Sequence, residues 1–251
     1  MKGFILDSDY QIIEDKSYIY LYGKLENNQT FVTINQYKPY FYIKEKDLKK
    51  ALKIEKFDYE DNEFKNFAGE KVIKIYAKTP QEITKLRLKF KDENLDYYEA
   101  DIKFIQRFLI DKGINSSLDI EGEYESSERV DRIYKEPELR PSYFFPELKL
   151  LSLDIETSSD GKILYCIGLY GKNYQSSFLL SKEKISNVCS CENEYELLLK
   201  FKEELFNYDP DIITGWNLVD FDLKFLKDKF EEYGIETDLG RGKKRLKIIK
   251  G

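Results

Sequence analysis

The chain has 251 residues, enough for one large domain or two ordinary ones, and hydrophobic residues make up 41% of it, so a buried core can form. Its formal net charge of −6 excludes a generally basic nucleic-acid-binding surface but not a local basic face. The sequence contains no histidine, which excludes Ser-His triads, histidine general bases and histidine-ligated zinc. Any chemistry must therefore use carboxylates, lysine, tyrosine or cysteine.

The three cysteines, Cys166, Cys189 and Cys191, do not have the number or spacing of a disulfide framework, which favours a reducing compartment. Cys189 and Cys191 without further thiols or histidines make a weak metal site. The N-terminus lacks the apolar segment of a secretory signal, and no apolar run reaches membrane-spanning length. A cytoplasmic protein without membrane association is expected.

The first part of the chain mixes short strands and helices. Apolar clusters predict strands at 4–6, 17–25, 30–35, 40–43 and 71–77, and a short helix at 46–52. Thr79 is expected as the N-cap, and Pro80 as the first residue, of a helix that continues to about Phe90. A further element begins at Tyr97 and leads into 102–110. This pattern indicates an α+β domain.

Residues 114–146 are rich in Ser, Glu and Pro, which indicates a linker that contains a domain boundary. We expect an N-terminal domain over 1–130 and a second domain over 131–251. The second domain begins with an apolar run at 148–155 that is typical of a strand buried on both faces. Strands at 163–170, 176–180 and 211–214 and helices at 192–208 and 222–233 follow, so this domain is predicted to be α/β.

Two carboxylates lie at the end of the apolar strand. Asp154 and Glu156 are two residues apart, so in a strand both side chains point to the same face. The D-x-E pattern alone is weak, because it occurs four times in the chain, and Asp119 and Glu121 even repeat the same tripeptide. Asp154 and Glu156 differ from the other three pairs because they lie in an apolar run, where a carboxylate needs a partner. Hard oxygen donors at such a position favour Mg²⁺ or Mn²⁺.

A second constellation lies in the segment DPDIITGWNLVDFD, residues 209–222, where a strand enters a glycine-containing loop and then a helix. Two interpretations are open. Asp220 or Asp222 caps the helix. Alternatively, Asp222 joins Asp154 and Glu156 around metal ions, and Asn217 and Phe221 contact the substrate.

Four segments, in order along nearly the whole chain, resemble the family B DNA polymerases. Two of them, LSLDIETSSDGKILYCIGLYG and DPDIITGWNLVDFDLKFL, resemble the first and second exonuclease motifs, the latter with the core N-x-x-x-F-D. The other two, KPYFYI and YYEADIKFIQRFLIDKGI, resemble an early strand and the end of the N-terminal domain. The archaeal branch is the most similar.

The resemblance implies a mixed α+β N-terminal domain followed by an RNase H-like 3′→5′ proofreading exonuclease domain that uses two Mg²⁺ or Mn²⁺ ions. It assigns Asp154, Glu156 and Asp222 as catalytic metal ligands, and Asn217 and Phe221 as contacts to the primer 3′ end. The implied partners are DNA, both primer and single-stranded template, and a C-terminal polymerase portion.

The family's third exonuclease motif, Y-x-x-x-D, has no match after Asp222, and no polymerase motif is present. We therefore expect an exonuclease domain that is incomplete at its C-terminus and at most weakly active alone. The alternative is a non-catalytic DNA-binding or assembly fragment of a split polymerase.

The archaeal resemblance also implies a pocket for template uracil, lined by Tyr10, Pro39 and Leu95, with Leu95 in place of a smaller valine. Ordinary core packing is the alternative for Pro39 and Leu95. The last eleven residues, 241–251, carry six basic residues and no acid, which fits either a strand edge protected by charge or phosphate contact.

Overall fold

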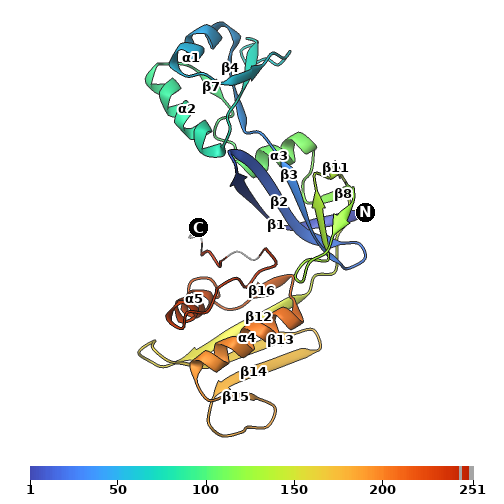
Figure 1. Cartoon of the computed structure of the whole chain (residues 1–251), viewed down its shortest axis with the longest axis vertical. Coiled ribbons are helices and arrows are strands. Elements are labelled where there is room, and N and C mark those ends of the chain that lie inside the picture. Colours follow the sequence, from blue (N-terminus) through green and yellow to red (C-terminus); the bar gives the residue numbers. More distant parts are fainter. Residues whose placement is uncertain (243–244, 249–251) are drawn as a thin grey trace. The chain divides into compact units, whose positions relative to one another are not determined.

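The computed structural model describes residues 1–242 and 245–248. The chain is mixed α/β with several sheets, and it forms two compact units, Met1–Pro146 and Glu147–Gly251 (Figure 1). None of the described helices is both long and apolar enough to cross a membrane.

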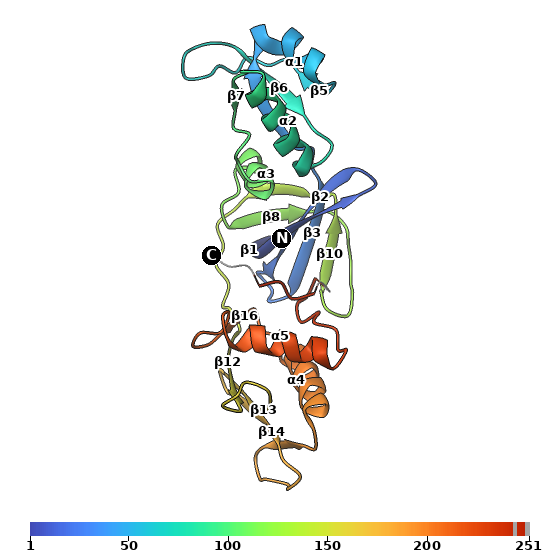
Figure 2. The ribbon, with the colours of Figure 1, turned by 90° about the vertical axis from the view of Figure 1, so that its left-hand side faces the viewer.

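A seven-stranded sheet forms the larger part of the first unit, in the order β11-β8-β1-β2-β3-β10-β9 (Figure 2). Helix α3, Phe104–Lys112, packs onto it through Phe108, which shares a core with Phe31 and Tyr134. The strands are β1 Lys2–Ile13, β2 Lys16–Leu25, β3 Thr30–Gln36, β8 Ser117–Glu121, β9 Tyr124–Glu125, β10 Arg132–Lys135 and β11 Glu138–Pro141.

The linker predicted at 114–146 is wrong, because β8 to β11 lie in it and belong to the seven-stranded sheet. These strands have two to five residues each, so their exposed faces and turns dominate the local composition. Two of them, β8 and β10, pair with β1 and β3, which are far away in the sequence. The backbone N–H and the hydroxyl of Thr30 both donate to Asp131, at 2.7 and 2.9 Å. The chain accordingly divides after Pro146 and not after residue 130.

A four-stranded sheet completes the first unit, in the order β5-β6-β4-β7. Its core contains Phe41 and Ile75 from the strands and Phe90 from helix α2. Thr79 is the N-cap of α2 and Pro80 its first residue, as predicted, but the Thr79 side chain makes no capping bond. The elements are β4 Tyr40–Lys44, a 3₁₀ turn Glu45–Asp47, α1 Leu48–Ile54, β5 Asp58–Glu60, β6 Val72–Tyr76, α2 Pro80–Asp92 and β7 Tyr97–Tyr98.

The second unit contains a five-stranded sheet in the order β15-β14-β13-β12-β16. Strands β12, β13 and β14 are antiparallel neighbours, while β16 runs parallel to β12. Helices α4 and α5 contribute Phe201 and Phe230 to the core beside Leu153. The elements are β12 Leu150–Thr157, β13 Leu164–Gly171, β14 Tyr174–Leu180, β15 Cys189–Cys191, α4 Glu194–Tyr208, β16 Ile212–Thr214 and α5 Asp222–Glu232.

Strand β12 is not buried on both faces, contrary to the prediction. Leu151, Leu153 and Ile155 are buried, whereas Asp154 and Glu156 are exposed on the alternate positions. The helices supply core side chains to one face of the strand only, and the other face carries the carboxylates. The apolar run in the sequence therefore indicated a strand correctly but overstated its burial.

The basic C-terminal stretch is described only in part, because Lys243, Lys244 and Lys250 lie outside the described residues. Arg241, the first residue of the stretch, pairs through its guanidinium with Asp209 and Asp211 at 2.9 Å each. Residues 245–248 are not in a strand.

Candidate active site

Strands β12 and β16 place the loop between β16 and α5 beside Asp154. Ser152 of β12 pairs with Thr214, the last residue of β16, so the chain leaves β16 next to the carboxylate-bearing half of β12. The register on the other side of β12 pairs Asp154 with Gly168 of β13, which has no side chain to cover it. Asp154 is therefore left open to solvent.

The loop 215–221 is fixed against the sheet by its backbone. A Cβ added at Gly215 would lie 2.4 Å from the carbonyl oxygen of Leu153, so only glycine fits this contact. Asn217 has a left-handed backbone with φ of 54°, and its carbonyl accepts a hydrogen bond from the N–H of Phe221 at 3.0 Å. Leu218 is buried in the core below. The loop thus turns tightly and delivers Asp222 to the start of α5.

Asp222 is 1% exposed, and its Oδ1 accepts a hydrogen bond from the backbone N–H of Ile155 at 3.1 Å. Its Oδ2 is buried without a hydrogen-bond partner among the described residues. The capping interpretation is wrong, because the N-cap of α5 is Phe221 and no side chain makes a capping bond there. The carboxylate is instead directed at β12.

The electrostatic environment of Asp222 disfavours its negative charge. Burial raises the pKa of the carboxyl above its ordinary value of 3.8, and the nearby charge of Asp154 raises it further. Hydrogen bonds from backbone N–H groups, including that of Ile155, act in the opposite direction but do not cancel the effect. A cation beside the unpartnered Oδ2 would remove this penalty.

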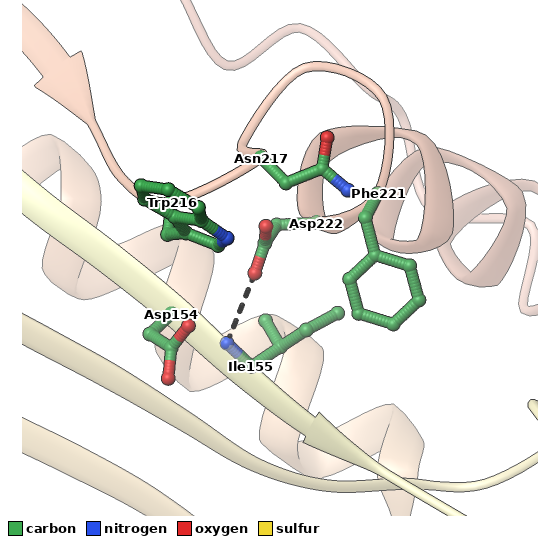
Figure 3. A pocket seen from close by; sticks show the side chains of 6 residues that line it. All are labelled: Asp154, Ile155, Trp216, Asn217, Phe221 and Asp222. Carbon is green, nitrogen blue, oxygen red and sulfur yellow. Dashed lines mark hydrogen bonds between the residues drawn. The ribbon is translucent and has the colours of Figure 1, made fainter. Parts of the chain in front are cut away.

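Asp154 and Asp222 face one open cavity of about 420 Å³ (Figure 3). The predicted residues Asn217 and Phe221 line the same cavity. The complete lining is Asp154, Ile155, Trp216, Asn217, Phe221 and Asp222. The structure thus brings together four of the five residues that the sequence proposed for this site.

Glu156 does not line the cavity. It pairs across the sheet with Cys166, whose thiol has a pKa raised first by burial and then by the charges of Glu156 and Asp154. Within residues 1–242 and 245–248 no three Asp, Glu, Cys or His side chains cluster closely enough to hold a metal ion. The three carboxylates therefore lie on neighbouring elements, but only two share the cavity.

The sequence interpretation missed Trp216, which lines the cavity and is 91% exposed. It is the only tryptophan in the chain, and it stands directly before Asn217 in a turn between a strand and a helix. A large aromatic residue in such a turn is itself a signal for ligand contact.

The structure does not bring the three residues of the expected uracil pocket into one cluster. Tyr10 packs edge-to-face on Phe104, with ring centroids 5.4 Å apart, at the core of the seven-stranded sheet. Leu95 is 5% exposed in the separate core of the four-stranded sheet. Pro39 is buried before β4, and its carbonyl accepts a hydrogen bond from Ala77 at 2.9 Å.

Comparison with known proteins places the chain in a family. Residues 163–251 match the sequence model for the exonuclease domain of DNA polymerase family B. DNA polymerase II of Escherichia coli is 33% identical over 189 residues, which are 72% of this chain and 23% of that protein. A DNA polymerase of Archaeoglobus fulgidus is 31% identical over 259 residues, which are 96% of this chain and 32% of that protein.

The fold agrees with these matches. The family B DNA polymerase from the hyperthermophilic archaeon Pyrobaculum calidifontis superimposes with a TM-score of 0.79 at 21% identity, over 98% of this chain and 34% of that chain. The chain spans between about a quarter and a third of the length of these relatives. It belongs to the family B DNA polymerases, as their N-terminal and exonuclease region, and is homologous over nearly its whole length to the archaeal enzymes.

Proposed function

We propose that the second unit is an RNase H-like exonuclease domain that removes nucleotides from the 3′ end of a DNA primer in a divalent-metal-dependent reaction. The first unit is then the polymerase N-terminal domain, and the whole serves DNA replication or repair together with a polymerase portion. The observation that carries this proposal is the buried, unpartnered Oδ2 of Asp222 in the cavity that Asp154 also lines.

The donor set fits a hard divalent cation such as Mg²⁺ or Mn²⁺, because every ionisable side chain at the cavity is a carboxylate. Asp154 and Asp222 would hold the ion, with Glu156 from the same face of β12 as a further ligand. A bound divalent ion would activate a water molecule and offset the charge that develops on the phosphate.

The chain's own residues have distinct roles in this proposal. The N–H of Ile155 holds the Asp222 carboxylate against β12 and leaves Oδ2 free for a ligand. Asn217 offers amide donors to the sugar or phosphate, and the half-exposed ring of Phe221 offers a stacking face to the terminal nucleotide. The tight turn holds Asn217 and Phe221 at the cavity wall, so that little conformational entropy is lost when they bind the substrate.

A second candidate function is non-catalytic DNA binding. It is favoured by one observation, namely that Glu156 lies outside the cavity and that the described residues contain no group of three potential ligands. For the same reason we expect a slow nuclease, because a two-carboxylate site holds Mg²⁺ less well than a complete one.

The experiment follows nucleotide release from a 3′-labelled single-stranded primer in Mg²⁺ and in Mn²⁺. We expect release by the wild-type chain and none by Asp154→Ala. Asp119→Ala is the matched control, because Asp119 belongs to the same D-I-E tripeptide on β8 in the first unit. Equal release by all three proteins contradicts the assignment of Asp154. Metal-dependent primer binding without release supports the second candidate.

A further inference from the structure

Strand β16 leads into the loop of the candidate active site, although the strand is short and partly exposed. It has three residues, Ile212–Thr214, and lies at the edge of the five-stranded sheet beside β12. Its first and last residues are exposed. A shift of β16 by one residue along β12 would move the loop 215–221 by about 3.3 Å relative to Asp154. The geometry of the site therefore depends on the contacts that fix the register of β16.

Asp211 fixes this register where β16 begins. Its backbone N–H donates to the carbonyl oxygen of Lys149 at 2.8 Å, and its Oδ2 accepts a hydrogen bond from the N–H of Lys149 at 2.8 Å. These two bonds extend the pairing of Leu150 with Ile212 by one residue. The Asp211 side chain is fully buried, and a buried carboxylate is stable only beside hydrogen-bond donors and a positive charge.

Arg241 brings a positive charge to this carboxylate. Its Nη2 donates to Oδ1 of Asp211 at 2.9 Å, and its Nε and Nη2 donate to the two carboxylate oxygens of Asp209 at 2.9 Å each. A guanidinium that binds a carboxylate in this bidentate way is fixed in orientation as well as in position. Asp209 is the C-cap of α4, so the guanidinium spans the turn between α4 and β16.

The segment that carries Arg241 is itself anchored. Leu239 packs against the core of the second unit, and Asp238 pairs with Lys202 of α4. This segment follows α5, which begins with Asp222. The site loop has β16 on one side and α5 on the other, and Arg241 joins the chain after α5 back to the start of β16. Both flanks of the loop are thus tied together.

We propose that Arg241 is a positioning residue for the candidate active site. It acts through Asp211, whose bonds to Lys149 set the register of β16, and so it holds the loop where Asp154 and Asp222 share one cavity. The consequence for metal binding rests on the proposed function, whereas the effect on the loop does not. Arg241→Ala takes the guanidinium away from a buried carboxylate, so the start of β16 loosens and the loop becomes more mobile.

Two measurements on the full chain test the inference, both at a temperature well below the Tm of every variant. The emission anisotropy of Trp216, the only tryptophan of the chain, reports the mobility of the loop. Calorimetric titration with Mn²⁺ gives the Kd of the ion. Relative to the wild type, Arg241→Ala should lower the anisotropy and raise the Kd about 10- to 100-fold. Arg241→Lys should give intermediate values, because lysine keeps the charge but cannot bind Asp209 in a bidentate way.

Two controls separate positioning from stability. Arg140→Ala removes a guanidinium that pairs with Glu121 and Glu138 in the first unit, and it should match the wild type in both measurements. Leu197→Ala leaves a cavity in the core of the second unit, so it should lower the Tm but keep the anisotropy and the Kd.

A merely structural role predicts that Arg241→Ala behaves as Leu197→Ala does, with a lower Tm and wild-type anisotropy and Kd, and that result overturns the inference. If Arg241→Ala does not fold, Arg241→Lys takes its place in the comparison. Wild-type anisotropy in Arg241→Lys then overturns the inference, and a lower anisotropy supports it.

The inference and the nuclease assignment fail separately. Lower Trp216 anisotropy and weaker Mn²⁺ binding in Arg241→Ala, in a chain whose wild type releases no nucleotides, support the role of Arg241 and contradict the nuclease. Nucleotide release with the same kcat and KM in the wild type and in Arg241→Ala, together with unchanged anisotropy, leaves the nuclease intact and overturns the role of Arg241.

Discussion

The Oδ1 of Asp222 accepts a hydrogen bond from the N–H of Ile155, 67 residues earlier in the chain, at 3.1 Å. This bond joins the first turn of α5 to β12 at the residue that follows Asp154. It uses one carboxylate oxygen for structure and leaves Oδ2 buried without a partner among the described residues, in a residue that lines the same cavity as Asp154. A residue that only stabilised the fold would need no such free oxygen, because an unpaired buried oxygen destabilises the native state.

The first prediction concerns pH. Because burial raises the pKa of Asp222 above 3.8, the native state holds this proton more tightly than the unfolded state does. The carboxyl therefore favours folding at pH values below 3.8, and this contribution is lost as the pH rises through the native pKa. The side chain of the Asp222→Asn variant is uncharged at every pH, so the stability of this variant does not fall for this reason.

Thermal unfolding of both proteins without divalent ions, at several pH values above 3.8, measures the effect. The Tm of the wild type should fall relative to that of Asp222→Asn as the pH increases. Parallel Tm profiles for the two proteins would show that Asp222 titrates alike in the native and unfolded states.

The second prediction concerns metal binding. A ligand that binds only the native state stabilises it, by about 2.7 kcal/mol at a free concentration of 100 times the Kd. Mg²⁺ or Mn²⁺ should therefore raise the Tm of the wild type, and should raise it less in Asp154→Asn and in Asp222→Asn. Asp119→Asn, with its carboxylate on β8, should respond as the wild type does. An equal rise in all four proteins would place the ion elsewhere.

The third prediction concerns the loop that carries Trp216 and Asn217. Gly215→Ala brings a Cβ to 2.4 Å from the Leu153 carbonyl oxygen, a backbone atom that cannot move aside easily. We expect the free energy of unfolding to fall by about 1–3 kcal/mol. Affinity for single-stranded DNA should fall as well, because the loop must shift. Gly240→Ala is the control, because an added Cβ there meets nothing within 4 Å. If urea unfolding gives the same free energy of unfolding for Gly215→Ala, Gly240→Ala and the wild type, the packing argument is wrong.

The fourth prediction concerns the first unit. If Tyr10, Pro39 and Leu95 recognise template uracil, a uracil-containing single strand binds more tightly than its thymine counterpart, and anisotropy titrations measure the difference. Leu95 is 5% exposed in a core, so Leu95→Ala should also lower the free energy of unfolding by about 2–5 kcal/mol. Equal affinities for the two strands remove uracil recognition and leave Leu95 with a packing role alone.

Much of the second unit could be predicted from the sequence because its signals are local. The apolar run before Asp154, the strand before Gly215 and the helix after Phe221 each occupy a continuous stretch, and their order brings the two motifs together. Asn217 was found through the family's motif, and it lines the cavity.

The remaining features depend on contacts that a sequence does not display. Asp222 is bound by the N–H of Ile155, 67 residues earlier, and a sequence does not display this contact, so the residue resembled an ordinary helix cap. Glu156 shares a strand face with Asp154, but two residues along a strand are about 6.6 Å apart, which is enough to leave the cavity. Two of the strands in the supposed linker, β8 and β10, pair with β1 and β3 about a hundred positions earlier, and the bond between Thr30 and Asp131 joins the same distant segments.

The nuclease assignment is tested by comparing the wild-type chain with Asp222→Asn on a 3′-labelled primer in Mg²⁺. Asparagine keeps an oxygen to accept the Ile155 bond but removes the charge beside the cavity. We expect that the wild type releases nucleotides, slowly, and that the variant folds, melts cooperatively and releases none. Equal release by a folded Asp222→Asn chain would contradict the claim that Asp222 and Asp154 form the nuclease site.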